Sequence, residues 1–469
     1  MTLWELSAAE LAAGYARGAF SPRDALASVL TRIDAVNPKI NAIVTFDIAG
    51  ARAGADASTA RWRDGSARGA FDGVPLTVKD NIPVRGMRAT WGSRIYADWV
   101  PETDELPIAR LRDGGAVILG KTNCPEFTLQ GYTANLLFGV TRNPWDIALT
   151  PGGSSGGAVA AVAAGLGPVA VGTDGGGSIR RPAAHTGLVG FKPSRDAVAR
   201  RDGFPVILLD CEVIGPIART VADARALFHA LAGAPVIPPS PAPRPLRILY
   251  VRQFGGSPVD AEIAASVEQA SRDLATLGHS VAEGEAPFDV EALNRAWPVI
   301  SQVGLAWLMK DHAGRLNEIS PPMQDMARAG NALSATDYYA AVDVILALRQ
   351  RLADFFVRTD LILTPAIAAL SWPAAEPFPP TIAGQPAGPR GHAVFTAFAN
   401  MAGCPAISIP CAPSKSGLPI GFQLVGPVGQ DETILAAAAQ YEARDGNSRR
   451  PFPPLELQQL PNIVRCTSG

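Results

Sequence analysis

The sequence is poor in cysteine and histidine, the residue types that most often bind metals or serve as nucleophile and base. Its five cysteines include no CxxC pair, so we expect neither a disulfide framework nor a zinc site, and reduced thiols are typical of the cytoplasm. Only His185 lies near Ser178 in the sequence, which argues against a Ser-His-Asp hydrolase and leaves each histidine a structural or surface role. The histidines are His185, His229, His279, His312 and His392.

The chain also lacks an excess of either charge and a long apolar run. It has 41 Lys and Arg against 43 Asp and Glu, which gives no sign of a nucleic-acid or anionic-membrane partner. The longest weakly polar run, residues 156–173, is interrupted by glycine and predicts a buried helix followed by a strand, because a spanning helix needs ~20 strongly apolar residues. The N-terminus shows no signal-peptide pattern. We therefore expect a soluble cytoplasmic protein.

Helix signals dominate the first 65 residues. A capping box at Ser7 opens a helix that should end near Gly18. Ser21-Pro22 opens a second helix, which should stop before Asn37-Pro38. A third helix, rich in Ala and Arg, is expected over residues 48–63.

From Gly73 onward, short apolar strands alternate with helices. Their nearly continuous apolar runs are typical of strands that are buried on both faces. They predict an α/β fold with a central mixed, mostly parallel sheet that helices cover on both sides. The Pro-rich stretch over residues 235–245 indicates a boundary. The loop over residues 371–391 is long for a compact domain, and such loops are usually functional or disordered.

Two clusters of glycine and serine, Pro151–Gly157 and Thr173–Arg180, bracket a segment of small residues. In the second cluster three glycines run into Ser178. Unhindered backbone N–H groups beside a hydroxyl suit acyl transfer, which needs a nucleophile and donors for an oxyanion. Plain turns and a phosphate loop are the alternatives. The phosphate loop is the weaker one, because neither cluster contains GxxxxGK[ST] or a helix-opening GxGxxG.

Around these clusters the sequence resembles the amidase signature family of serine hydrolases. GGSSGG and TDGGGSIRRPAA place Ser178 24 residues after Ser154. Four further segments also look like that family and fall in its order, so the resemblance covers most of the chain. They are GVPLTVKDNI (73–82), GKTNCPEF (120–127), NPWD (143–146) and GLPIGFQLVGP (417–427).

The resemblance implies a single α/β/α unit over residues 1–469. Within it we expect a helical part over 1–65, a core with the catalytic residues over 66–235, and a part over 236–469 that completes the sheet and the substrate pocket. It also implies catalysis without metal or organic cofactor by Lys79, Ser154 and Ser178. From composition alone, Lys79 would be a surface lysine paired with Asp80.

In the roles that the resemblance implies, neutral Lys79 accepts a proton from Ser154, and Ser178 attacks the amide carbon. Lysine can act in this way only if burial lowers its pKa. The family places a cis peptide bond just before the first serine, here Gly153–Ser154. Oxyanion donors are expected from the backbone of Gly175, Gly176 and Gly177, and supporting hydrogen bonds from Ser155, Asp174 and Arg180.

Two residues are candidate substrate contacts. Arg181 lies three residues past Ser178 and could reach an anionic substituent, although a partly exposed arginine without that role is the plainer interpretation. Tyr132 lies in a segment, residues 130–138, that departs from the polar form common in tRNA-dependent amidotransferases and favours an apolar or aromatic pocket. Cys124 is expected to be a buried thiol.

These observations predict a stand-alone amidase for a small-molecule amide, with an apolar or aromatic acyl group and no nucleic-acid or membrane partner. The alternative within the family is the glutaminase component of a tRNA-dependent amidotransferase. An alternative of another class is an inactive relative that serves as a binding module. The oligomeric state stays open, with a homodimer as one option.

Overall fold

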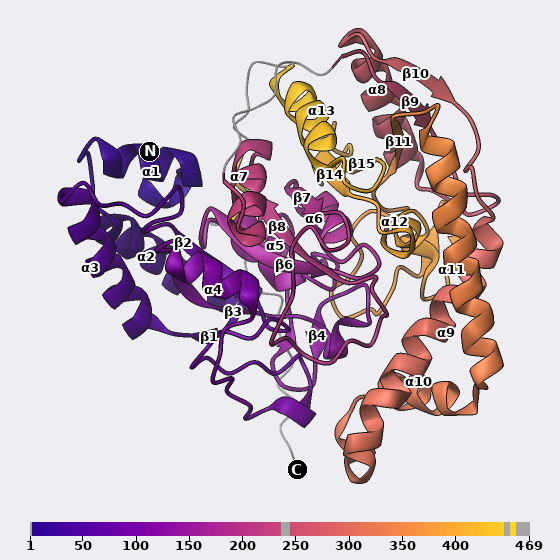
Figure 1. Cartoon of the computed structure of the whole chain (residues 1–469), viewed down its shortest axis with the longest axis horizontal. Coiled ribbons are helices and arrows are strands. Elements are labelled where there is room, and N and C mark those ends of the chain that lie inside the picture. The colour runs from indigo at the N-terminus through magenta and orange to yellow at the C-terminus, as the bar shows by residue number, and fades with distance from the viewer. Residues whose placement is uncertain (1, 236–243, 445–450, 456–469) are drawn as a thin grey trace.

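An eleven-stranded sheet runs through the middle of the computed structural model, which describes residues 2–235, 244–444 and 451–455 (Figure 1). The strand order is β1-β3-β2-β6-β8-β7-β14-β15-β11-β9-β10. The strands are β1 (Ile43–Phe46), β2 (Pro75–Lys79), β3 (Val117–Thr122), β6 (Val169–Asp174), β7 (Val189–Lys192), β8 (Val213–Ala218), β9 (Arg247–Tyr250), β10 (Ser280–Glu283), β11 (Leu361–Pro365), β14 (Ala406–Pro410) and β15 (Gly421–Val425). Two small hairpins pair β4 (Ala134–Asn135) with β5 (Gly139–Val140), and β12 (Thr381–Ile382) with β13 (Gln385–Pro386).

The sheet is mixed, as the sequence predicts. Parallel pairs form two triplets near its ends, β3-β2-β6 and β11-β9-β10. The remaining neighbours pair antiparallel, so the parallel share, four of the ten pairs in the described sheet, is lower than expected. A strand buried on both faces has an apolar sequence in either kind of sheet, and its composition therefore does not report the direction of its neighbours.

Helices cover both faces of the sheet, which confirms the α/β fold. Successive strand residues point to opposite sides: Leu361 and Leu363 join one core, and Ile362 joins another. The first core includes residues of α1 (Ala8–Ala16), α4 (Leu106–Asp113), α7 (Val221–Ala232), α8 (Ala261–Thr276) and α13 (Asp431–Ala443). The cores of the other face include residues of α2 (Pro22–Ile40), α3 (Ile48–Arg63), α5 (Gly156–Ala163), α6 (Arg180–Thr186), α9 (Val290–Met309), α10 (Pro321–Ala332), α11 (Ala335–Phe356) and α12 (Ala397–Ala402). Short 3₁₀ segments are η1 (Leu3–Glu5), η2 (Arg94–Tyr96), η3 (Glu126–Thr128), η4 (Lys310–Glu318) and η5 (Gly391–Ala393).

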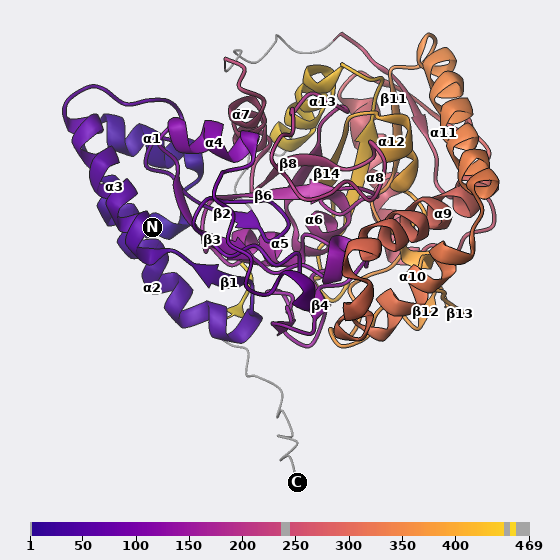
Figure 2. The ribbon, with the colours of Figure 1, turned by 60° about the horizontal axis from the view of Figure 1, so that its bottom comes forward.

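The two ends of the sheet carry different helices. Figures 1 and 2 both show α1 to α3 on one side of the molecule and α9 to α11 on the other, with the strands between them. Helices α9 and α10 pack against each other, and so do α9 and α11. The second half of the chain therefore adds a helical group to the sheet at the end opposite to the N-terminus.

The helices predicted near the N-terminus form, with one correction. Helix α1 begins after a capping box at Ser7, and α3 spans the predicted residues. Helix α2 does not stop before Asn37; it continues through Pro38 to Ile40. Ile40 is fully buried, and the Asn37 side chain accepts hydrogen bonds from the next backbone N–H groups, those of Ala42 and Ile43. Burial of this last turn outweighs the local cost of the proline.

Two sequence predictions concern the division of the chain. Most of the Pro-rich stretch over residues 235–245 lies outside the described residues. The boundaries at 65/66 and 235/236 stay predictions. Within the described ranges no helix combines the length and hydropathy that a membrane crossing requires.

We predict that Gly330→Ala destabilises the fold by separating α9 from α10. A Cβ atom at this position would lie 2.0 Å from the carbonyl oxygen of Gln302, which belongs to the backbone of α9. Overpacking of this kind costs about 1–3 kcal/mol, and the better helix propensity of alanine offsets only part of it. The matched control is Gly314→Ala, since a Cβ at Gly314 meets nothing within 4 Å. Urea denaturation should show a lower midpoint for Gly330→Ala alone, and equal midpoints would contradict the close approach.

Candidate active site

Lys79 and Asp174 end neighbouring parallel strands. Strands β2 and β6 pair in parallel, and these residues are their last ones. Because parallel strands end at the same edge of a sheet, the two side chains and the turns that follow them meet there. The chain thus brings together segments that are 95 residues apart in the sequence (174 − 79).

Lys79 is fully buried and contacts Ser154. Its Nζ lies 2.8 Å from Ser154 Oγ and 2.9 Å from the hydroxyl of Thr173, which also accepts from Asn81 at 3.0 Å. Burial disfavours the ammonium form and lowers the pKa of Lys79 to about 8. Lys79 is therefore not a surface lysine, and its position suits a base near neutral pH.

Asp80 does not pair with Lys79. Its carboxylate accepts hydrogen bonds from the backbone and hydroxyl of Thr90 and lies 3.9 Å from Lys121. Successive residues at the end of β2 point to opposite sides, which separates the two neighbours in the sequence. The ion pair expected from composition alone is thus wrong.

Ser154 lies on the turn that opens α5. The Gly153–Ser154 peptide bond is cis, as the family resemblance implies. The backbone N–H of Ser155 donates to the carbonyl of Ser178 at 3.0 Å, and the Ser155 hydroxyl donates to the carbonyl of Thr173 at 3.1 Å. Ser155 therefore holds the two serine-bearing turns against each other.

Asp174 shapes the turn that carries Ser178. Its carboxylate accepts hydrogen bonds from the backbone N–H groups of Gly177, Ile179 and Arg180, and from the Arg180 guanidinium at 2.9 and 3.0 Å. Burial by itself raises the pKa of Asp174, but the charge and hydrogen bonds of Arg180 hold it well below its usual range. Asp174 is thus an ionised anchor inside the protein.

The N–H groups of the glycine turn divide into two sets. Gly177 has φ +115°, and its N–H donates to Asp174 at 2.7 Å. In the described structure the N–H groups of Gly175, Gly176 and Ser178 have no hydrogen-bond acceptor, and these three residues line a cavity. The donors that remain available to an oxyanion are therefore those of Gly175, Gly176 and Ser178, while Gly177 supports the turn.

Arg180 joins this turn to the second half of the chain. Its guanidinium donates to the carbonyl of Thr396 at 3.1 Å and to the side chain of Gln423 at 2.9 Å. Asn400 donates to both the backbone and the carboxylate of Asp174. Thr396, Asn400 and Gln423 are supporting residues that sequence reasoning missed, because no local motif connects them to the turn.

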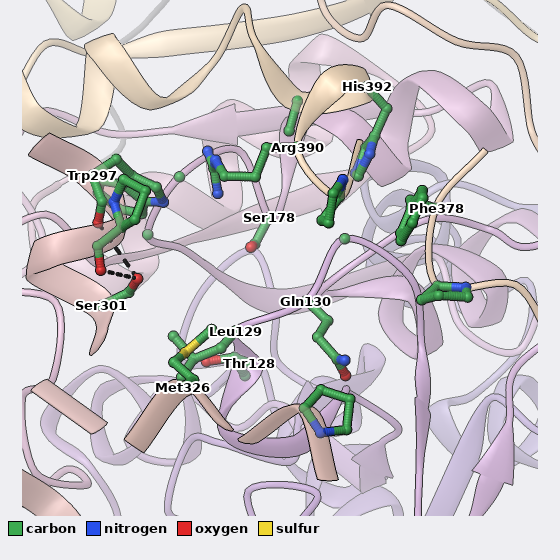
Figure 3. A pocket seen from close by; sticks show the side chains of 18 of the residues that line it. Thr128, Leu129, Gln130, Ser178, Trp297, Ser301, Met326, Phe378, Arg390 and His392 are labelled. Atoms are coloured by element: carbon green, nitrogen blue, oxygen red, sulfur yellow. Dashed lines mark hydrogen bonds between the residues drawn. The ribbon is translucent and has the colours of Figure 1, made fainter. Parts of the chain in front are cut away.

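Ser178 opens into a cavity of about 700 Å³ (Figure 3). Aromatic and apolar side chains form much of its wall: Leu129, Trp297, Met323, Met326 and Phe378. Figure 3 shows Ser178 between Arg390 and His392 on one side and Leu129 and Met326 on the other. The loop over residues 371–391 supplies part of this wall.

The two candidate substrate contacts differ in their placement. Arg181 lines the cavity and is 5% exposed, so it is not a surface arginine. Tyr132 does not line this cavity, whereas Gln130 and Gly131 do. Cys124 is fully buried and lies outside the cavity wall, and burial raises the pKa of its thiol, which disfavours a thiolate nucleophile.

The chain is similar to known amide-cleaving proteins over almost its entire length. Residues 24–435 match the family model described as Amidase. The A component of the glutamyl-tRNA(Gln) amidotransferase of Moorella thermoacetica is 34% identical, with 96% of this chain and 99% of that protein covered. A crystal structure of an amidase superimposes with a TM-score of 0.87 at 31% identity, covering 94% of this chain and 100% of that one. The structure of a bacterial aryl acylamidase of the amidase signature family superimposes with a TM-score of 0.85 at 28% identity, covering 93% of this chain and 96% of that one.

We predict that Arg180→Met costs about 3–5 kcal/mol of unfolding free energy, because it leaves the buried carboxylate of Asp174 without its cation. The measurement is chemical denaturation at pH 7. The comparison variant is Arg328→Met, which breaks an exposed ion pair with Asp325 and should change the stability little. A loss for Arg180→Met no larger than that of Arg328→Met would show that the buried pair does not brace the turn.

Proposed function

The chain belongs to the amidase family, whose members hydrolyse carbon–nitrogen amide bonds, and on that premise we propose that it cleaves a carboxylic acid amide through an acyl-enzyme on Ser178. The products are the acid and either ammonia or an amine. The observation that carries this proposal is the buried Lys79, whose Nζ lies 2.8 Å from Ser154 on a turn that is hydrogen-bonded to Ser178.

In the proposed mechanism, the neutral amine of Lys79 accepts the proton of Ser154 while Ser154 takes the proton of Ser178. The Ser178 oxygen then attacks the carbonyl carbon, and the negative charge moves to the carbonyl oxygen. N–H groups of Gly175, Gly176 and Ser178 are free to stabilise that oxyanion. The described structure contains no hydrogen bond between the two serine hydroxyls, so the proposed relay requires one to form when substrate binds.

Breakdown of the tetrahedral intermediate requires a proton on the departing nitrogen. An amine is a poor leaving group, and Ser154 is placed to return the proton that it accepted. Water then enters in place of the amine, gives its proton to the same relay, and attacks the Ser178 ester. The acid leaves and the hydroxyl of Ser178 is restored.

A second candidate function is that of the glutaminase component of a tRNA-dependent amidotransferase. The full-length similarity to the A components of glutamyl-tRNA(Gln) amidotransferases favours it over the stand-alone amidase, and on similarity alone it has the better support. The apolar side chains of the cavity wall instead favour a stand-alone amidase for an apolar or aromatic acyl group, although the segment over residues 130–138 contributes only Gln130 and Gly131 to that wall. Both functions use the same three residues, so substrate tests must separate them.

We predict that the purified protein alone hydrolyses an aryl or aliphatic amide, and that Ser178→Ala abolishes this activity. Product acid is followed over a panel of aliphatic, aryl and arylacetic amides plus glutamine. Cys124→Ala should retain turnover, because the Cys124 thiol is buried away from the cavity. Activity on glutamine alone, and only after the other amidotransferase components are added, would instead establish the glutaminase function.

Labelling of Ser178 tests the alternative that the protein is an inactive relative that serves as a binding module. A serine-directed phosphonate should label wild type at Ser178 and leave Ser178→Ala unlabelled. Absence of labelling together with silence on the whole panel would favour a binding module over an enzyme.

We predict that kcat/KM rises with pH and levels off above about 8, because protonated Lys79 cannot accept a proton and its pKa is lowered to about 8. Lys79→Met should lose about 10²- to 10⁴-fold in rate, the usual contribution of a general base. Lys192 is the matched control, since burial also lowers its pKa to about 8 and its Nζ donates to the Pro193 carbonyl. The inflection should persist in Lys192→Met. Its loss in that variant would assign the titration to Lys192 and contradict the prediction for Lys79.

A further inference from the structure

Among the described residues, Arg390 is a cation without a counterion in the wall of the cavity. It lies near the end of the loop over residues 371–391, and its guanidinium carbon lies 5.6 Å from the centroid of the Trp297 ring. Within the described residues this guanidinium makes no hydrogen bond and no ion pair. Burial lowers the pKa of Arg390 to about 10, so the side chain is still charged at neutral pH. Its partner in the described structure is thus an aromatic face, which is a weak substitute for an anion.

Arg181 adds a second guanidinium to the same cavity. Its Nη1 donates to the carbonyl of Gly176 at 2.8 Å and its Nη2 to the carbonyl of Gly153 at 3.4 Å. Its Nε is buried and has no acceptor among the described residues. Burial and then the nearby charge of Arg390 lower the pKa of Arg181 to about 9. Two like charges therefore lie close enough to repel each other.

His392 borders the two arginines and has unused polar atoms. The residue is 1% exposed and lines the cavity, and the centroid of its ring lies 4.8 Å from that of Trp372. Neither ring nitrogen has a hydrogen-bond partner in the described structure. Burial and the positive charges of Arg181 and Arg390 lower the pKa of His392 well below its usual value. The neutral ring can therefore donate one hydrogen bond without adding a third positive charge.

The cavity wall, as far as the structure describes it, offers no carboxylate to these two arginines. Glu212 is the one acidic residue among the described lining residues, and its carboxylate accepts from Arg200 at 2.7 Å. Arg200 also bonds Glu105, so Glu212 belongs to a separate ion network. Arg181 is buried and Arg390 is half-buried, and charges withdrawn from water are normally paired, because desolvation without a partner is costly. The group that completes this corner is therefore expected to be an anion that arrives with the ligand.

We propose that Arg390, with Arg181 and His392, binds a carboxylate of the substrate, so that the enzyme acts on amides that carry a carboxylate in addition to the scissile bond. This inference rests on the proposed amide hydrolysis at Ser178. A planar carboxylate matches the fork of a guanidinium, and the unpaired Nε of Arg181 and a ring N–H of His392 are further donors. The apolar wall holds the rest of the molecule.

The test compares amides that differ in one carboxylate. Succinanilate and butyranilide place the difference on the acyl side, and 4-acetamidobenzoate and acetanilide place it on the amine side. Wild type should prefer the anionic member of at least one pair. Arg390→Gln should lower kcat/KM for that anionic amide by about tenfold to a hundredfold, the loss expected for a charge-assisted hydrogen bond, and leave its neutral partner nearly unchanged.

Arg295→Gln is the matched control. It removes the same charge from helix α9, where Arg295 is 71% exposed in its side chain and does not line the cavity. Its discrimination between the paired amides should equal that of wild type. The proposal is overturned if wild type does not discriminate in either pair, if Arg390→Gln slows both members equally, or if Arg295→Gln loses as much discrimination.

A binding measurement separates this inference from the proposed function. Calorimetry on Ser178→Ala should detect succinanilate or 4-acetamidobenzoate more tightly bound than the neutral partner, and adding Arg390→Gln should remove the difference. If no amide is hydrolysed but this difference is seen, the proposed hydrolysis fails and the carboxylate site stands. Hydrolysis of neutral amides without any difference in binding would overturn only the carboxylate site.

Discussion

The site depends on one constraint, which is that the pKa of a buried amine, that of Lys79, must be lowered inside the protein. Three acidic residues could oppose this effect. The charges of Asp174 and Glu212 raise the pKa of Lys79, and Asp80 follows Lys79 in the sequence, but each of the three carboxylates is bound by other residues. Asp80 is held by Thr90 and Lys121, Asp174 by Arg180, and Glu212 by Arg200. Because none of them forms an ion pair with Lys79, burial dominates and the pKa of Lys79 falls. The surrounding ion pairs thus leave Lys79 without a carboxylate partner, and in this way they help to lower its pKa.

The same arrangement explains why the two serine turns are bound so closely to the sheet. Lys79 and Asp174 are the last residues of parallel neighbours, and each anchors one turn through a hydrogen bond. Ser155 then joins the turns to each other. A shift of either strand by one residue would turn its terminal side chain to the opposite face and separate the groups. Register in the sheet is therefore a condition for the chemistry.

The cavity wall and the proposed catalytic residues come from different parts of the chain. Helices α9 and α10 and the loop over residues 371–391 form much of its wall, whereas Lys79, Ser154 and Ser178 come from the first half of the chain. Arg180 and Asn400 connect the two parts through hydrogen bonds to the same carboxylate, that of Asp174. In the proposed mechanism, this division allows one proton relay to serve different cavities. It is consistent with the range of amide-cleaving proteins to which the chain is similar.

The sequence by itself determined the local elements and the glycine-rich turns, because caps, apolar periodicity and positive-φ glycines act over a few residues. It also indicated Lys79, Ser154 and Ser178, since they lie in long motifs of the family that it resembles. Only the tertiary structure decided that Pro38 stays helical, that Asp80 turns away from Lys79, and which glycine N–H groups remain free. Arg390 and His392 lie more than 200 residues from Ser178, in a segment without a recognisable motif. Pairing of β7 with β14 joins the two halves of the chain in one sheet and brings these residues to the cavity, and no local pattern encodes a contact made across that distance.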